Sequence, residues 1–251
     1  LIMADHMSFF MVYVIMAACL LPGVLTTLLA PEPDAPAGTP KSLKEAAIGP
    51  LVDYFSRNGA VWILVFILLY KIGDQMASAM TTPFYLDIGF TKTEIGAVVK
   101  IFGFSATIAG SLIGGILMLR LGINRSLWVF GFLQALSTAG FAILAKIGYS
   151  VVALSGVIAF ENLSGGMGTA AYVAFMASIT NKKFTATQYA LLTSLMGVPR
   201  VMASAPTGFL AKNIGWEGFF IFCTLIAIPG MLLLFKFAPW NTVRMEFAEN
   251  E

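Results

Sequence analysis

Five charged side chains lie within stretches of sequence that are otherwise apolar enough to cross a lipid bilayer. Three of them are cations and two are anions: Lys71, Asp74, Lys100, Glu161 and Arg200. An ionisable group in hydrocarbon is costly unless it faces a partner charge or water. These residues are therefore the first candidates for a site inside a bundle of membrane helices.

Lys71 and Asp74 have i, i+3 spacing, and Gln75 follows at once, so all three project from one region of a helix. At 1.5 Å per residue Lys71 lies roughly 18 Å from the start of its span near Gly59, close to the bilayer midplane. Two interpretations remain open. The pair is either a static ion pair that holds the bundle together, or a pathway site in which Asp74 exchanges protons while Lys71 and Gln75 bind substrate.

Glu161 lies at a similar depth, roughly 20 Å from the start of its own span near Gly148. No opposite charge lies within one turn of it, and Asn162 is its neighbour. A carboxylate removed from water takes up a proton more readily. We therefore predict that Glu161 couples transport to protons, that Asn162 binds substrate, and that pairing of Glu161 with Lys71 competes with the local Asp74 pair.

The remaining two cations differ in depth. Arg200 follows Pro199, a residue that can kink its span, and a group that is always charged suits an anionic ligand. Lys100 is shallower, so it either snorkels to the surface or binds substrate. With three cations against two anions, the predicted cavity is mildly positive.

The composition predicts the class of protein that must hold these charges. Hydrophobic residues make up 58% of the 251 residues and charged residues 11%, and the mean hydropathy is +0.85. This balance is typical of an all-α membrane protein with several spans. A net charge of +2 without a basic run gives no sign of nucleic acid binding. Neither cysteine has metal-ligand spacing, so no metal and no cofactor are expected.

Seven stretches are long enough to span as helices of roughly 20 residues. Basic residues concentrate in the linker, in two loops and at the C-terminus, which predicts that residues 30–58 and 239–251 are cytoplasmic. Within the linker, Lys41 to Arg57 is predicted to form a short amphipathic helix. The predicted spans are 8–29, 59–86, 94–119, 127–145, 149–179, 186–211 and 217–237.

An internal repeat relates the spans. The segment from Phe90 to Glu94 is matched 94 residues later by the segment from Phe184 to Gln188, and both carry a Thr-x-x-Glu/Gln capping box. Residues 59–147 and 148–238 are therefore predicted to be two three-helix repeats. An odd number of spans places the copies in opposite orientations, which is the plan of secondary transporters. The third span of each repeat buries no charge, so we expect it to face lipid, with Gln134 making only a local hydrogen bond.

The glycine-rich segments are predicted to pack helices together. Gly165 to Gly168 lies within a span and lacks the residues of a phosphate loop. Gly110 and Gly114 form a small-residue face, which we expect at a contact between two halves of a larger protein.

Several blocks of sequence resemble one transporter family, namely Leu28 to Pro33, Pro50 to Asn58, Tyr70 to Asp74, Phe160 to Thr169 and Phe184 to Leu192. They are similar to the AmpG-type muropeptide permeases of the major facilitator superfamily. The resemblance implies a proton-driven importer of anionic anhydromuropeptides, which are sugar-peptide fragments of the cell wall, in a bacterial inner membrane. It also implies a six-helix bundle preceded by one additional transmembrane helix, residues 1–29, that closes a missing N-terminal six-helix half. One departure is Leu119, where the superfamily's loop motif usually has aspartate.

Other functions remain as alternatives. Carriers of acetyl-CoA or another organic anion would also suit a positive cavity. An integral-membrane enzyme is less favoured, because the single histidine is His6 and no Ser/His or metal-ligand cluster is visible. A purely structural or sensory bundle would not need five charges at depth. The sequence thus favours a transporter and not an enzyme.

Overall fold

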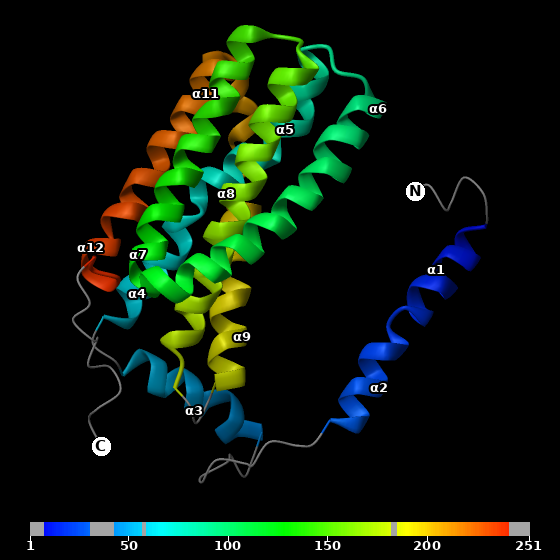
Figure 1. Ribbon diagram of the computed structural model, residues 1–251. Helices are drawn as coiled ribbons and strands as arrows, with labels where there is room; N and C mark the ends of the chain where they lie inside the picture. The colour runs from blue at the N-terminus through cyan, green and yellow to red at the C-terminus, as the bar shows by residue number, and fades with distance from the viewer. Residues whose placement is uncertain (1–7, 31–42, 57–58, 182–184, 241–251) are drawn as a thin grey trace. The chain divides into compact units, whose positions relative to one another are not determined.

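The computed structural model describes residues 8–30, 43–56, 59–181 and 185–240. In these ranges every regular element is a helix, which confirms the predicted all-α class (Figure 1). The chain divides into two compact units, residues 1–39 and 40–251, which are described separately.

The first unit contains two helices in succession, α1 (Phe9–Ala18) and α2 (Leu21–Leu29). Ser8 caps α1, since its hydroxyl accepts a hydrogen bond from the backbone N–H of Met11 at 3.4 Å. Pro22 at the start of α2 fits a helix N-terminus, where its missing N–H is not needed. Residues 10–29 are together long and apolar enough to cross a membrane.

The second unit holds the remaining elements. They are α3 (Leu43–Phe55), α4 (Ala60–Tyr70), α5 (Ile72–Asp87), α6 (Lys92–Glu94), the π-helix η2 (Ile95–Phe102), α7 (Gly103–Ile147), α8 (Val151–Ser178), α9 (Thr185–Leu195), α10 (Gly197–Met202), α11 (Thr207–Leu232) and α12 (Leu234–Phe237). Four stretches of this unit are long and apolar enough to span, namely 60–87, 92–147, 151–178 and 207–237. The long helices lie alongside one another as a bundle (Figure 1).

Two glycines reverse the chain inside the longest helical stretches. Residues 92–147 would extend roughly 84 Å as a straight helix, far beyond a bilayer core of about 30 Å. Gly122 interrupts it with φ 75° and ψ 165°, and Gly215 interrupts α11 with φ 71° and ψ 170°. Glycine adopts this conformation at no steric cost. The breaks lie 93 residues apart, close to the 94-residue offset of the sequence repeat, whose inverted arrangement stays a prediction.

The predicted sixth span, residues 186–211, is wrong as a single helix. The chain instead forms α9, α10 and the start of α11, with turns at residues 203–206. Two prolines explain the interruption: Pro199 lies within α10 and Pro206 immediately precedes α11. Each lacks the N–H that would continue the helical hydrogen-bond ladder.

The predicted capping box at the start of α6 is confirmed. The hydroxyl of Thr91 accepts from the backbone N–H of Glu94 at 3.2 Å, and the Thr91 N–H donates to the Glu94 carboxylate at 2.8 Å. The matching box in the second repeat involves Thr185, whose side chain lies outside the described residues. Helix α6 and the π-helix therefore begin at a well-defined point.

The linker helix packs on the second half of the chain. Helix α3 lies within the predicted segment 41–57, and its Asp53 carboxylate accepts hydrogen bonds from Gln188 at 2.7 Å and Asn181 at 3.1 Å. Gln188 also donates to the carbonyl of Pro50 at 3.1 Å. These bonds fix α3 against the start of α9. Residues 31–42 of the predicted linker lie outside the described part of the chain.

Side chains after Gly122 hold the segment that follows α12. Three donors bond three consecutive carbonyls: Asn124 to Pro239 at 3.4 Å, Arg125 to Trp240 at 3.2 Å and Trp128 to Ala238 at 2.9 Å. Leu119, where the loop motif departs from the expected aspartate, is 86% exposed. The side chains that follow Gly122 therefore anchor residues 238–240 through their backbone carbonyls.

The glycine faces pack α7 directly on α8. A Cβ atom built on Gly114 would lie 2.7 Å from Cα of Met167, and one on Gly166 would lie 2.8 Å from the backbone nitrogen of Ser111. The prediction of close packing at 165–168 is thus confirmed. The expectation that Gly110 and Gly114 face another half is wrong, because they pack against α8 of the same unit.

The third spans do not simply face lipid. In the second part of α7 (123–147), Phe130, Gln134 and Phe141 are buried, and in α11 Phe219 and Phe220 are fully buried. Apolar side chains suit lipid and a neighbouring helix equally well, so composition could not separate the two surroundings. The second part of α7 therefore lies inside the described bundle and can contribute to a site.

Candidate functional site

A layer of polar side chains lies between two apolar clusters. The first cluster includes Phe66, Tyr70, Phe130, Tyr172 and Phe175, and the second includes Met76, Phe84, Phe141, Ile158 and Phe220. Along each helix the polar residues fall between members of the two clusters: 71–74 in α5, 134–138 in α7 and 161–169 in α8. Three helices thus present polar groups at one depth of the bundle.

Lys71 lies at a break in its span. Helix α4 ends at Tyr70 and α5 begins at Ile72, and Lys71 itself has φ −105° and ψ 2°. Its N–H points to the carbonyl of Leu69, which leaves the carbonyl of Ile67 without its usual helical partner. The hydroxyl of Tyr172 donates to this carbonyl at 2.6 Å. The break is therefore satisfied by a side chain from α8.

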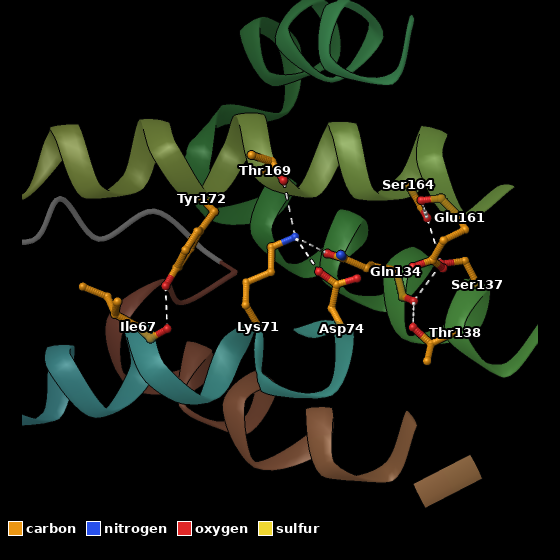
Figure 2. Close-up of polar contacts among 10 residues, drawn as sticks. All are labelled: Ile67, Lys71, Asp74, Gln134, Ser137, Thr138, Glu161, Ser164, Thr169 and Tyr172. Atoms are coloured by element: carbon orange, nitrogen blue, oxygen red, sulfur yellow. Dashed lines mark hydrogen bonds and ion pairs between the residues drawn. The ribbon is translucent and has the colours of Figure 1, made fainter. Parts of the chain in front are cut away.

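The ammonium of Lys71 meets three oxygen ligands (Figure 2). It donates to Oε1 of Gln134 at 2.8 Å and lies 3.4 Å from Oγ1 of Thr169 and 3.8 Å from the Asp74 carboxylate. The side chain of Lys71 is only 6% exposed, so these groups replace most of its water. The predicted i, i+3 ion pair with Asp74 is confirmed, and helices α7 and α8 supply the other two ligands.

Glu161 lies on the other side of Asp74 from this cation. Its Oε2 accepts a hydrogen bond of 2.5 Å from Ser137, which in turn accepts from Ser164 at 2.9 Å (Figure 2). Glu161 and Asp74 also line the same cavity, so the two acidic groups share one space. In this structure the direct ion pair of Lys71 is with Asp74, while Glu161 accepts from Ser137.

A cavity of about 360 Å³ opens in the polar layer. Its volume falls within the range of roughly 300–1,000 Å³ common for ligand pockets. The described residues that line it are Lys71, Asp74, Ser78, Thr81, Thr82, Tyr85, Val99, Lys100, Thr107, Gln134, Phe141, Ile158, Glu161, Asn162, Gly165, Gly166 and Thr169. The charged and polar groups of four helical segments, α5, η2, α7 and α8, therefore share one space.

Comparison with known proteins shows the family of the chain. Residues 1–204 match the description "Major Facilitator Superfamily". The chain belongs to this superfamily. It is 45% identical over 223 residues to the anhydromuropeptide permease of Escherichia coli strain K12, an alignment that covers 88% of this chain and 45% of that protein.

Two further relatives give a similar picture. An uncharacterized protein of Haemophilus influenzae is 42% identical over 235 residues, covering 89% of this chain and 55% of its own length. A protein of Rickettsia conorii named "Putative transporter AmpG 4" is 38% identical over 187 residues, covering 74% and 45%. The chain therefore spans about half the length of these relatives. The resemblance to AmpG-type permeases seen in the sequence blocks is confirmed, and the chain is a multi-pass membrane protein of the facilitator superfamily.

Five of the seven predicted site residues line the cavity of about 360 Å³: Lys71, Asp74, Lys100, Glu161 and Asn162. Asn162 is fixed there, because its Oδ1 accepts from Thr107 at 2.8 Å and its Nδ2 donates to the carbonyl of Ile158 at 2.9 Å. Lys100 projects from the π-helix η2 and remains exposed. Roles for these residues stay predictions, but the fold brings them together.

The other two predicted residues are elsewhere. Arg200 is exposed on α10, and neither it nor Gln75 lines the cavity. Among the described lining residues two cations, Lys71 and Lys100, therefore face two anions, Asp74 and Glu161. The mildly positive cavity expected from the sequence is wrong for this part of the protein, because it depended on Arg200.

The polar face of the second part of α7 was not predicted from the sequence as part of the site. Gln134 was expected to form only a local bond, yet it ligates Lys71, which is 63 residues away, and Ser137 donates to Glu161. Gln134, Ser137 and Thr138 have i, i+3, i+4 spacing, so they share one helix face. That spacing within an apolar span was the available signal.

Proposed function

We propose that this chain forms part of a proton-coupled importer that carries anionic anhydromuropeptides from the periplasm to the cytoplasm through a bacterial inner membrane. The observation that carries the proposal is the charged cavity: Lys71, Asp74 and Glu161 lie together between two apolar clusters of a membrane bundle. Its substrate class comes from the identity of 45% with the anhydromuropeptide permease.

Proton coupling is supported by two acidic groups in one cavity. Asp74 and Glu161 both line it, and Lys71 pairs with Asp74 at 3.8 Å. With one proton on the acidic pair, the three groups sum to zero charge. Without it they carry one negative charge in a poorly hydrated layer, which is costly. Binding and release of a single proton therefore changes the charge that the bundle must hold.

Substrate binding is supported by the other lining residues. Lys100 and Lys71 supply cations for the carboxylates of a peptide, and Asn162 supplies an amide. On α5 the hydroxyl residues Ser78, Thr81 and Thr82 line the same cavity. Hydroxyl groups both donate and accept hydrogen bonds, so they suit the hydroxyl-rich surface of a sugar. The lining thus matches the two chemical parts of a sugar-peptide.

The basic residues support the proposed topology. They favour a cytoplasmic linker and C-terminus, with the beginning of α4 on the cytoplasmic side and the beginning of α8 on the periplasmic side. The Escherichia coli and Rickettsia conorii relatives are named as a permease and a putative transporter, and the function proposed here involves no enzymatic step.

The test uses the protein as the cell makes it, in inverted or right-side-out membrane vesicles. We expect Glu161→Gln to abolish uptake of an anhydromuropeptide driven by a proton gradient, while exchange of labelled for unlabelled substrate without a gradient persists. Glu217→Gln is the matched control, because that glutamate is 44% exposed and pairs with Lys146 outside the cavity. Proton-driven uptake by Glu161→Gln at the wild-type rate would contradict the proposal.

A further inference from the structure

Gln134 contacts the charged site through one end of its amide. It is 6% exposed, and its Oε1 accepts from Lys71 at 2.8 Å. This is the shortest of the three Lys71 contacts, since Thr169 lies at 3.4 Å and Asp74 at 3.8 Å. Gln134 therefore holds the ammonium away from a direct charged hydrogen bond with Asp74, which would measure about 2.8 Å.

The other end of the same amide has no protein partner. Among the described residues, Nε2 of Gln134 is fully buried and donates no hydrogen bond. Turning the amide over would place its two N–H donors against the ammonium of Lys71, which has no acceptor to offer. The donor therefore points away from Lys71, and a buried donor without an acceptor is unfavourable.

A second, much smaller cavity, called the inner cavity below, adjoins this region. It measures about 10 Å³ and lies where α5, α7 and α11 meet, with Asp74, Gln134 and Thr138 in its wall beside Tyr70, Gly131, Ala135, Cys223, Ala227 and Met231. A space of about 10–15 Å³ on this measure holds one water molecule, provided two to four polar partners are present. Gln134, Asp74 and Thr138 each bring a polar side chain to its wall. Asp74 and Gln134 line both cavities, so they form the boundary between them.

We propose that Gln134 is a positioning residue for two charged groups at once: it holds Lys71 directly through Oε1 and holds Asp74 through a single water in the inner cavity. The consequence is a division of partners within the polar layer. Lys71 stays bonded to Gln134 beside the large cavity, while the Asp74 carboxylate keeps an oxygen directed to the space that Glu161 also lines. The effect on substrate binding rests on the proposed function, whereas the water and the coupling to Lys71 do not.

The glycine-rich segment of α8 provides the space for this arrangement. A Cβ atom at Gly168 would lie 2.7 Å from Oε1 of Gln134, and one at Gly165 would lie 3.8 Å from Nε2. Any side chain at position 168 would therefore push the amide off Lys71. In addition to its part in helix packing, Gly168 therefore leaves the space that the Gln134 amide occupies beside Lys71.

A structure of the intact protein at a resolution that shows ordered waters tests the water directly. We expect a water peak in the inner cavity within hydrogen-bonding distance of Nε2 of Gln134 and of the Asp74 carboxylate. Ala227→Val, which adds two methyl groups to the wall of this cavity, should remove the peak and leave Lys71 on Gln134. An inner cavity without a water in the wild-type protein would overturn the proposal.

A double-mutant cycle on thermal stability tests the coupling to Lys71. We expect Gln134→Leu to lower the melting temperature of the purified protein, and to have no such effect in a Lys71→Met background, where no ammonium remains to be held. Equal losses in both backgrounds would show a structural role and overturn the proposal. If Gln134→Leu alone does not fold, Gly168→Ala takes its place in the cycle, because it displaces the same amide.

Substrate binding separates positioning from a general defect. We expect Gln134→Leu to raise the KM for a muropeptide with free carboxylates by about tenfold, the size typical for one charge-assisted hydrogen bond. The KM for the same compound with its carboxylates amidated should change little. An equal rise for both probes would contradict the positioning of Lys71, whereas failure of the Glu161→Gln test alone would count against proton coupling.

Discussion

A single added methyl group at Gly110 should separate the two helices that carry most of the site. A Cβ atom there would lie 2.8 Å from Cα and 2.9 Å from the carbonyl carbon of Leu163, with the Leu163 oxygen closer still. All three atoms belong to the backbone, so no side chain can rotate out of the way. Gly110 itself does not line the cavity, which makes the change a test of packing alone.

The magnitude follows from the geometry. Ordinary van der Waals contact begins near 3.4 Å, so α7 and α8 would have to move apart by at least roughly 0.6 Å at this point. Overpacking of this kind costs about 1–3 kcal/mol, and the better helix propensity of alanine returns about 0.5–1 kcal/mol. We therefore expect Gly110→Ala to lower the free energy of unfolding by about 1–2 kcal/mol.

Gly115→Ala is the matched control on the same helix, because nothing in the described structure lies within 4 Å of its added Cβ atom. It should be neutral or slightly stabilising. The assay is unfolding of the purified protein by SDS in mixed micelles, followed by the far-ultraviolet circular dichroism of its helices. Equal stability of the two variants would refute the close approach of α7 and α8 at Gly110.

Two further predictions concern tyrosine hydroxyls. Tyr172→Phe should cost about 1–3 kcal/mol of unfolding free energy, because the carbonyl of Ile67 at the break before Lys71 would lose its buried donor; the same SDS titration measures this, and no change would contradict that role for the hydroxyl. In the loop between α7 and α8, Tyr149 donates to Glu94 at 2.5 Å, and this bond raises the pKa of Tyr149 above its ordinary value of 10.0, so its contribution to stability is complete below pH 10 and is lost as the pH rises further. An absorbance titration that compares wild type with Tyr149→Phe should show one tyrosine that ionises above the ordinary pH, and ionisation at the ordinary pH would refute the bond.

The sequence predicted the helical class and the charged site because both follow from strong local signals. Apolar stretches of about 20 residues indicate spans, and charges within them stand out. The prediction of Lys71, Asp74 and Glu161 in one region needed only their depth along two spans. The interruption at Pro199 and Pro206 was harder to predict, because proline both kinks and breaks helices, and the outcome depends on which neighbours satisfy the freed backbone groups.

The contribution of Gln134 could not be weighed from charge alone. An uncharged amide in an apolar span has two common outcomes, a bond within its own helix or a bond to a distant partner, and only the packing of α7 against α5 and α8 decides between them. Arg200 shows the opposite error. Its charge and depth suggested a ligand site, but those features do not say toward which neighbour a helix turns its face.

The polar layer depends on side chains from α5, α7 and α8. A buried ammonium with Asp74 alone, at 3.8 Å, would have a weak partner, and Glu161 would then face an acidic neighbour without a shared donor. Oxygens from α7 and α8 complete the coordination of Lys71, while Ser137 supplies a donor to Glu161. Because Lys71 and Glu161 are both held by side chains from other helices, a shift of α8 relative to α5 would change these contacts. Under the proposed function, this is how protonation of the layer would be coupled to movement of the helices.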